Sequence, residues 1–472
     1  MSAPTTNAAR AAYGPRFLAP LLLGPLLNPI NTTMISVALV PISHDLGVPS
    51  STVVWLVAGL YLTSAVAQPT LGRVGDLLGP RRVYLAGLVV VAVAGLLPLV
   101  LPGFGAVILA RVLIGLGTSA AYPSVMSMIR ARAEHTGVPT PPAVLSGISI
   151  STLTSAAIGP VLGGVLIDVA GWRAIFAVNV PLALAAFAMT WCWVPEVRRR
   201  EPTSLRALDP VGIVVFAATI GTLLVFILDL STPHWWLLAL SALALAVLCW
   251  WELRRTEPFL DLRMLAANQP LTRTYLRMFL LYLGFYAMTY GYSQWVQDDA
   301  GFSSGAAGLL QLPTAGLAGL MSIAIARSTR VRAPILIAAC TPILGGLLML
   351  GLHSSSPIGY LVLIAALFGV AQGLASVSNQ QVLYRQAPAS QIGTASGLSR
   401  TFVYLGAIAS SGVLGATFGD APTDANMHLL GALIAAAAAL VLVLAITDRS
   451  LRGRPRATEL ADPGSGGAGR RR

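Results

Sequence analysis

Charged residues are scarce in this chain. They make up 10% of the 472 residues, while hydrophobic residues make up 56%; a soluble globular domain carries about 25% charged residues. Lysine is absent, so all thirty cationic residues are arginine. This composition excludes an ordinary soluble domain. The net charge of +12 does not indicate nucleic-acid binding, because the arginines lie at the edges of apolar runs and not on one amphipathic face.

Cysteine and histidine are also few. The three cysteines, Cys192, Cys249 and Cys340, lie within apolar runs, and their odd number and spacing favour neither a disulfide framework nor a metal site. The five histidines fall in loops or at the ends of apolar runs, and the chain has neither an HExxH nor a GxSxG motif. We therefore expect no enzyme, no metal and no cofactor.

Long apolar runs dominate the chain instead. Fourteen of them are long enough to cross a hydrocarbon core about 30 Å thick as helices. The first run lacks a small-residue cleavage site, which predicts a retained span and not a signal peptide. We predict an all-α polytopic membrane protein with spans at residues 17–40, 52–71, 83–102, 104–128, 145–168, 174–194, 211–230, 234–251, 275–296, 305–326, 333–352, 356–378, 394–418 and 427–446.

Arginines fall almost entirely in every second connection, and this alternation predicts the orientation. The opposite connections hold Asp45, Asp168, Asp229, Asp298, Asp299, Asp420 and Asp424, with Arg173 as the single arginine assigned there. Both termini are therefore predicted to be cytoplasmic, in the cell membrane. The arginines assigned to the cytoplasmic side are Arg10, Arg16, Arg73, Arg81, Arg82, Arg130, Arg132, Arg198, Arg199, Arg200, Arg206, Arg254, Arg255, Arg263, Arg273, Arg327, Arg330, Arg332, Arg385 and those of the tail.

A short internal repeat predicts the domain organisation. The phrase SGIS at 146–149 returns as SGLS at 396–399, in each case opening a span after a cytoplasmic loop. Internal repeats are the usual architecture of secondary transporters. We predict a cytoplasmic segment at 1–16, a six-helix bundle at 17–194, a linker with two inserted spans at 195–274, a second six-helix bundle at 275–446 and a disordered basic tail at 447–472.

One loop carries a specific motif. Residues 72–82 read GRVGDLLGPRR, in which glycines permit a tight turn and the Asp76 carboxylate can pair with arginines or a helix N-terminus. A loop that only satisfies the positive-inside rule would also contain arginines. The spacing of Gly, Asp, Gly and paired basic residues, however, resembles the cytoplasmic signature loop of the major facilitator superfamily.

Three further segments resemble motifs of that superfamily. ARVLIGLG at 110–117 resembles its motif with a membrane-embedded arginine, and SAAIGPVLGG at 155–164 resembles the motif of its antiporters, with Ser155 in place of the usual first glycine. GWRAIFAVNVP at 171–181 is similar to the sequence typical of the fourteen-helix drug:H+ antiporter branch. Arg111 could instead snorkel to the interface, and the glycines could serve ordinary helix packing. The resemblance implies gating or coupling roles for Gly72, Asp76, Arg81, Arg82, Arg111, Gly159, Pro160, Gly163 and Gly164.

The first span departs from the pattern of that branch. Asn31 stands where an acidic residue is typical, and none of the eighteen carboxylates lies in the middle third of a predicted span. Recognition of multivalent cations and proton relays both usually need an intramembrane acid. We therefore favour a neutral or anionic substrate. Protons would then bind a peripheral carboxylate such as Asp76, Asp168 or Asp229, or transport would proceed without stoichiometric protons.

Uncharged polar residues near the middle of the spans form a candidate substrate pocket. They are Asn28, Asn31, Tyr61, Gln68, Tyr286, Tyr290, Gln311, Gln372 and Asn379. Each could merely bond a neighbouring helix. With the family resemblance, they imply a monomeric secondary transporter whose partners are a small molecule, protons and the lipid bilayer. We expect it to export an amphipathic drug-like or antibiotic-like compound, with lipid export or uptake symport left as alternatives.

Overall fold

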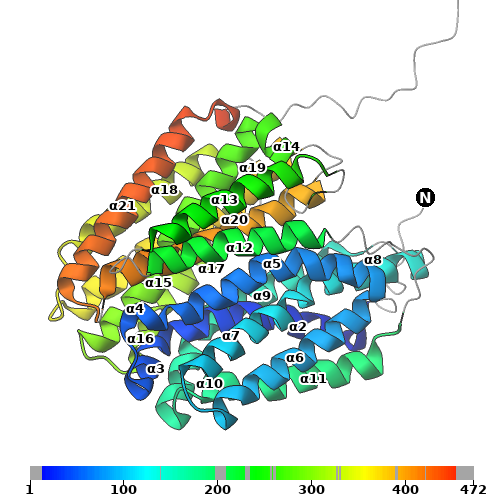
Figure 1. Ribbon diagram of the computed structural model, residues 1–472, viewed down its shortest axis with the longest axis horizontal. Helices are drawn as coiled ribbons and strands as arrows, with labels where there is room; N and C mark the ends of the chain where they lie inside the picture. The colour runs from blue at the N-terminus through cyan, green and yellow to red at the C-terminus, as the bar shows by residue number, and fades with distance from the viewer. Residues whose placement is uncertain are drawn as a thin grey trace, which may run out of the picture.

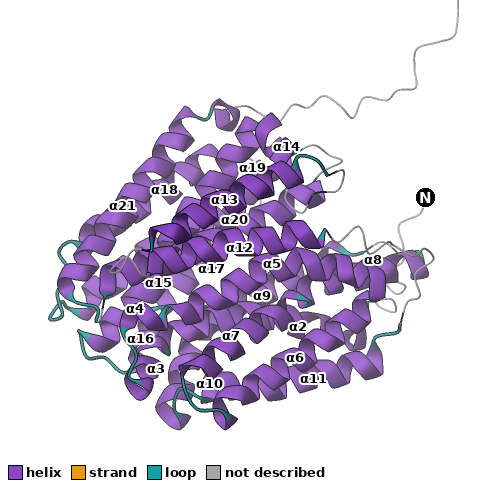
Figure 2. Ribbon diagram, in the orientation of Figure 1, coloured by secondary structure: helices purple, strands orange, loops and turns teal. Residues whose placement is uncertain are grey.

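The computed structural model describes residues 13–138, 140–196, 209–228, 234–255, 258, 262–325, 328, 331–387, 392–419 and 421–452, and every regular element in these ranges is a helix (Figures 1 and 2). This confirms the predicted all-α fold. The first helices are α2 (Pro15–Met34), η1 (Ile35–Val37), α3 (Leu39–Leu46), α4 (Ser50–Val53), α5 (Trp55–Leu78), α6 (Pro80–Val100), α7 (Phe104–Ser119), α8 (Ala121–Thr136), α9 (Pro142–Ala170), α10 (Ala174–Ala177) and α11 (Asn179–Trp193). After them come α12 (Pro210–Leu228), α13 (Trp235–Glu252), α14 (Leu262–Ala267), α15 (Gln269–Asp298), α16 (Ser304–Leu310), α17 (Leu312–Ile325), α18 (Arg332–Met349), α19 (Ile358–Gln386), α20 (Ile392–Phe418), α21 (Asp424–Thr447) and η4 (Arg449–Arg452).

The helices are suited to a membrane. Eleven described segments are long and apolar enough to cross one, and two shorter apolar helices, Thr154–Ala170 and Pro210–Phe226, accompany them. Large apolar side chains lie exposed along the outer faces of these helices, such as Val93 on α6, Leu243 on α13 and Val443 on α21. Lipid tails accept such side chains without the cost that water would impose. The protein is therefore a multi-pass membrane protein.

Prolines explain why four predicted spans are interrupted. The helical path breaks at Ala38, Ala120, Val178 and Gln311, and a proline follows two or three residues later in each case, at Pro41, Pro123, Pro181 and Pro313. A proline has no N–H, so it cannot donate to the carbonyl four residues earlier, and its ring crowds that carbonyl. The break between η1 and α3 divides the first predicted span.

The helices pack in two groups. In the first helix group (α2–α11), α2 packs on α9 and α11, and α7 packs on α5 and α6. In the second helix group (α15–α21), α15 packs on α20, α17 on α19, and α18 on both α19 and α21. The hairpin of α12 and α13 lies beside them, with α12 touching both α5 and α20 (Figure 1).

Ion pairs lie at both ends of the bundle. The α3 end, which carries α3, α4 and α16, contains ion pairs of Asp45 with Arg173 (3.1 Å) and of His44 with Asp298 (2.9 Å). The α8 end, which carries α8 and α14, contains Arg82 paired with Glu196 at 2.7 Å. The predicted runs at 198–200 and 206, and the tail from 453, lie outside the described residues.

A buried ion pair fixes the second helix group at the α8 end. Arg277 of α15 lies 2.7 Å from Asp448, directly after α21, and their side chains are 0% and 2% exposed. Removing one partner leaves the other charge buried and uncompensated.

We expect Arg277→Met to cost about 3–5 kcal/mol of unfolding free energy, measured by equilibrium unfolding in mixed micelles. The double variant Arg277→Met/Asp448→Leu should regain much of this loss, because neither charge is left unpaired. Arg273→Met, one turn earlier on the exposed face of α15, is the matched control. Equal losses in the Arg277 and Arg273 variants would show that the buried pair is not the cause.

Candidate functional site

Arg111 of α7 lies buried where three helices meet. Its side chain is 1% exposed; its Nε donates to the Leu56 carbonyl of α5 at 2.8 Å, and its Nη1 donates to the Asn31 carbonyl of α2 at 2.9 Å. Because the guanidinium is enclosed by protein, it does not snorkel to the membrane interface. Its charge is stabilised by backbone dipoles from two neighbouring helices.

The break after α2 makes the Asn31 carbonyl available. In a continuous α-helix the N–H of Ile35 would donate to Asn31, but here it donates to the Thr33 carbonyl as the chain enters the tighter turn of η1. The adjacent Thr32 carbonyl accepts the hydroxyl of Tyr290 at 2.7 Å. The irregular backbone of the first span therefore provides acceptors for both Arg111 and Tyr290.

Asn31 also forms hydrogen bonds through its side chain. Its side-chain amide and that of Asn179 exchange two hydrogen bonds, of 2.5 and 3.0 Å, and both residues are buried. Asn179 opens α11 directly after the break at Val178, which precedes Pro181. The pair joins α2 to α11 in the first helix group.

Four tyrosines from both helix groups form a cluster, which we call the tyrosine cluster. Tyr61 of α5 lies 5.0 Å from the Tyr286 ring and 5.8 Å from the Tyr404 ring, and its hydroxyl lies 3.1 Å from the hydroxyl of Tyr290. Since Tyr290 donates to the Thr32 carbonyl, Tyr61 is the donor in that bond. Such amphipathic rings can hold an apolar ligand while their hydroxyls orient its polar groups.

Two glutamines extend these contacts between the groups. The Tyr404 hydroxyl donates to the Gln68 side chain at 2.7 Å, and Gln311 of α16–α17 donates to the Ser36 hydroxyl at 3.2 Å. Asn28 differs, because it donates to Thr118 inside the first helix group at 2.9 Å.

Small residues on α9 allow close approach of α2 and α16. A Cβ at Gly163 would lie 2.9 Å from the Met34 carbonyl, and one at Gly164 would lie 2.6 Å from the Ser304 carbonyl. Gly159 packs on Thr33, and the Pro160 carbonyl packs on Gly308. These glycines therefore lie at a junction that includes both helix groups.

The α3 end of that junction carries polar links between the groups. Asp168 at the end of α9 accepts the Gly305 N–H of α16 at 3.1 Å, and the Ser51 N–H of α4 donates to the Gly419 carbonyl at 2.9 Å. With the His44–Asp298 pair, they keep the two helix groups in contact at this end.

The signature loop lies at the α8 end, away from these links. Gly72 packs against Pro123 of α8, Arg81 donates to the Trp191 carbonyl at 2.8 Å, and Arg82 pairs with Glu196. The backbone of Asp76 is helical, and its side chain lies outside what the structure describes.

The structure gathers only part of the predicted pocket. Gln372 and Asn379 lie on α19, where the Asn379 amide donates to the Ala375 carbonyl of its own helix at 2.9 Å. Tyr404, Asn179 and Arg400 are not among the residues predicted from sequence. Asn179 belongs to the 171–181 motif and could have been selected from it; Arg400 of α20 lies over the Tyr122 ring of α8 at 5.6 Å.

Similarity to known proteins identifies the family. The model of the Major Facilitator Superfamily matches residues 21–411. The chain belongs to the major facilitator superfamily. It is a transporter and not an enzyme, as its relatives also indicate.

Several transporters of this superfamily are similar to the chain over most of its length. The MFS-type transporter YwoD of Bacillus subtilis is 36% identical, covering 92% of this chain and 97% of that protein. The multidrug efflux pump LfrA of Mycolicibacterium smegmatis is 30% identical, over 85% and 80%. A solved POT family transporter has the same fold, with a TM-score of 0.66 at 13% identity over 92% and 96%.

The hydrogen bond from Tyr290 to Thr32 yields a test of the contact between the groups. We expect Tyr290→Phe to weaken the contact between the groups by about 1 kcal/mol. A reporter cysteine introduced at Ala38 should then react with a thiol-specific maleimide about fivefold faster. Ala38 is 0% exposed beside η1, and the three native cysteines are replaced in this background.

Tyr292→Phe is the matched control for this variant. It removes a hydroxyl two residues later on α15 that makes no hydrogen bond within the described structure, so labelling at Ala38 should not change. Identical labelling rates in the Tyr290 and Tyr292 variants would refute the proposed role of the bond.

Proposed function

We propose that the transporter exports a small amphipathic compound, drug-like or antibiotic-like, across the cytoplasmic membrane by alternating access coupled to proton entry. The observation that carries the proposal is the tyrosine cluster, which joins helices of both groups through Tyr61 and Tyr290. A ligand between them would contact both groups and so bias their relative position. LfrA, named a multidrug efflux pump, and the tetracenomycin C resistance and export protein of Streptomyces glaucescens, 28% identical over 90% of this chain and 80% of that protein, support this substrate class.

The proposed topology has fourteen spans with both termini in the cytoplasm. The eleven apolar segments, the two shorter apolar helices and the 30-residue α15 supply fourteen helices of suitable length. The two helix groups would be the six-helix bundles, with α12 and α13 as the inserted pair. Since arginines favour the cytoplasmic side, the α8 end faces the cytoplasm and the α3 end faces outward. The described conformation then has its outer end closed.

The substrate that fits this interior is neutral or anionic. Arg111 contributes a buried positive charge whose described partners are backbone carbonyls, and the tyrosine cluster and Gln68 contribute hydroxyl and amide groups. A multivalent cation would gain no carboxylate from these groups and would be repelled by Arg111. Asn28, Gln311, Gln372 and Asn379 remain candidates for further polar contacts with the substrate.

Proton coupling must use carboxylates at the ends of the helices. Asp168 accepts the Gly305 N–H across the two groups, and protonating its carboxyl would weaken that bond and favour opening of the α3 end. Burial and the neighbouring Asp424 carboxyl raise the pKa of Asp299, which makes it a second proton acceptor at this end. Asp229 lies outside the described residues, and Asp76 stays a proposed switch at the other end.

Transport into inverted vesicles tests the coupling. We expect an imposed gradient, acidic on the side of the α3 end, to raise the uptake of a fluorescent neutral or anionic amphipathic probe several-fold. Asp168→Asn should remove most of this stimulation while leaving equilibrium binding of the probe unchanged. The reason is that the amide cannot switch its charge with pH.

Asp45→Asn is the control for the same charge change at the same end. Asp45 pairs with Arg173 and Trp172 inside the first helix group, so its loss leaves the link between the groups intact. If uptake by the wild type did not depend on the pH gradient, proton antiport would be rejected. If a broad compound panel showed neither uptake nor altered tolerance in a sensitive host, drug export itself would be rejected.

A further inference from the structure

Arg400 of α20 is an arginine within a membrane span, and the proposed transport cycle does not yet use it. It lies in the apolar segment Leu398–Phe418, where a charged side chain is costly unless it faces the interior of the bundle or a water-filled path. Its guanidinium lies over the ring of Tyr122 at 5.6 Å, and Tyr122 belongs to α8 of the first helix group. Arg400 therefore lies at the contact between the two helix groups.

The Arg400 guanidinium does not snorkel to the cytoplasmic interface. Tyr122 is the second residue of the 16-residue α8, about 20 Å along the helix axis from the last residue, Thr136. A guanidinium that stacks on this ring stays well inside the bundle, whereas a snorkelling side chain would extend towards the level of Thr136. The location of the charge thus calls for a role in the interior.

The charge of Arg400 has no acidic partner among the residues that the structure describes. Its contacts there are with tyrosines: the Tyr122 ring and, within electrostatic range, Tyr282, Tyr286 and Tyr404. The Arg400 side chain is exposed, and Tyr122 is 38% exposed. Because a ring covers only one face of the planar guanidinium, its N–H edges stay available for the two oxygen atoms of an oxyanion.

A second guanidinium lies at the other end of the tyrosine cluster. Arg111 is within electrostatic range of Tyr290, and its Nη2 makes no hydrogen bond in the described part of the chain. Along α15 the rings of Tyr282, Tyr286 and Tyr290 follow one another at 6.0 and 5.8 Å, from the Arg400 side to the Arg111 side. The electrostatic potential is therefore positive at both ends of this row of rings.

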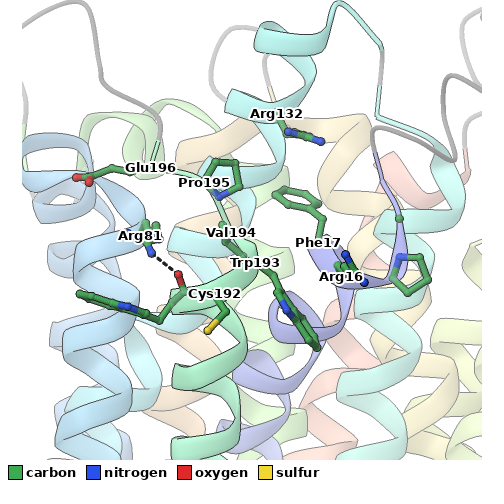
Figure 3. Close-up of a pocket in the computed structure, with 12 residues that line it drawn as sticks. Arg16, Phe17, Arg81, Arg132, Cys192, Trp193, Val194, Pro195 and Glu196 are labelled. Carbon is green, nitrogen blue, oxygen red and sulfur yellow. Dashed lines mark hydrogen bonds between the residues drawn. The ribbon is translucent and has the colours of Figure 1, made fainter.

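A surface pocket elsewhere in the molecule does not join the two helix groups. It has a volume of about 850 Å³ and lies among α2, α8 and α11 (Figure 3). Its lining residues belong to the first helix group and to the segments directly beside those helices. A ligand there would contact one group alone and could not bias the relative position of the two. The site at Arg400, by contrast, joins α20 to α8.

We propose that Arg400 binds the carboxylate of the transported compound, whose apolar body lies on the tyrosine cluster. This inference rests on the export function proposed above and narrows its substrate class to amphipathic monoanions. A carboxylate can accept two charge-assisted hydrogen bonds from one guanidinium. A neutral compound of the same shape would lose these bonds, and a cation would be repelled. Arg400 thus sets the charge selectivity where the substrate enters from the cytoplasm.

Three dansyl probes test the site because they share one aromatic body. Dansylglycine carries a carboxylate, dansylglycinamide is neutral and dansylethylenediamine is cationic. We expect the purified full-length protein in micelles to bind dansylglycine about tenfold more tightly than dansylglycinamide, measured by probe fluorescence. Arg400→Gln should remove this preference by weakening dansylglycine binding alone. Arg400→Lys should keep part of it, since the positive charge remains.

Arg254→Gln is the matched control. Arg254 is also an exposed arginine that lies over an aromatic ring, that of Trp250 at 4.3 Å, but it follows α13 of the inserted hairpin. A wild type that bound the three probes equally, or bound none of them, would overturn the proposal. Equal losses of dansylglycine affinity in Arg400→Gln and Arg254→Gln would overturn it as well, because general surface charge would then explain the binding.

Uptake into inverted vesicles separates this inference from the proposed export. If a pH gradient drives uptake of dansylglycine and dansylglycinamide alike, and Arg400→Gln changes neither, export stands and the carboxylate site is rejected. If dansylglycine binding depends on Arg400 but no gradient drives its uptake, the site stands and proton-coupled export is rejected.

A second variant keeps the test decisive if Arg400→Gln does not elute as a monodisperse protein. Tyr122→Leu removes the ring that holds the guanidinium, so dansylglycine should bind about threefold more weakly while dansylglycinamide binding stays the same. Unchanged affinity for dansylglycine in this variant would contradict the proposal.

Discussion

The buried guanidinium of Arg111 is the constraint on which the centre of this transporter depends. A cation enclosed among apolar helices is costly unless acceptors surround it. Here the acceptors are backbone carbonyls of α2 and α5, and the carbonyl of α2 is available because the helix tightens into η1. Pro41 follows this irregular turn and cannot donate to the carbonyl four residues earlier, that of Val37. One interrupted helix therefore allows a permanent positive charge inside the bundle.

This interruption also connects the two helix groups. Thr32, directly after Asn31, accepts the Tyr290 hydroxyl from the second group, and Ser36 within η1 accepts from Gln311. The glycines of α9 bring α2 and α16 close enough for this contact, because any larger residue would collide with backbone atoms. Small residues keep the contacting helix surfaces smooth. The polar contacts between these surfaces can therefore break and re-form together, as alternating access requires.

Much of the fold could be predicted from sequence, because hydropathy and arginine placement are local signals. Arg111 is buried and does not reach the interface, and the glycines at 163 and 164 allow close helix approach, while the gating or coupling roles of these residues stay predictions. The tyrosine cluster could be predicted only in part, since Tyr404 reaches Gln68 across 336 positions of the chain and no periodicity encodes such a contact. Gln372 and Asn379 lie at helical positions like those of the other predicted pocket residues. The local hydropathy pattern, however, does not indicate which face of α19 contacts the first helix group.

The central claim is that the two ends of the bundle open in alternation around the tyrosine cluster. Electron–electron double resonance between spin labels at Ser51 and Ala421 reports the α3 end, and labels at Arg130 and Arg385 report the α8 end. The account predicts that acidification widens the first distance and shortens the second in the same population. Distances that lengthen together, or an α3 end that stays closed at every pH and substrate concentration, would contradict it.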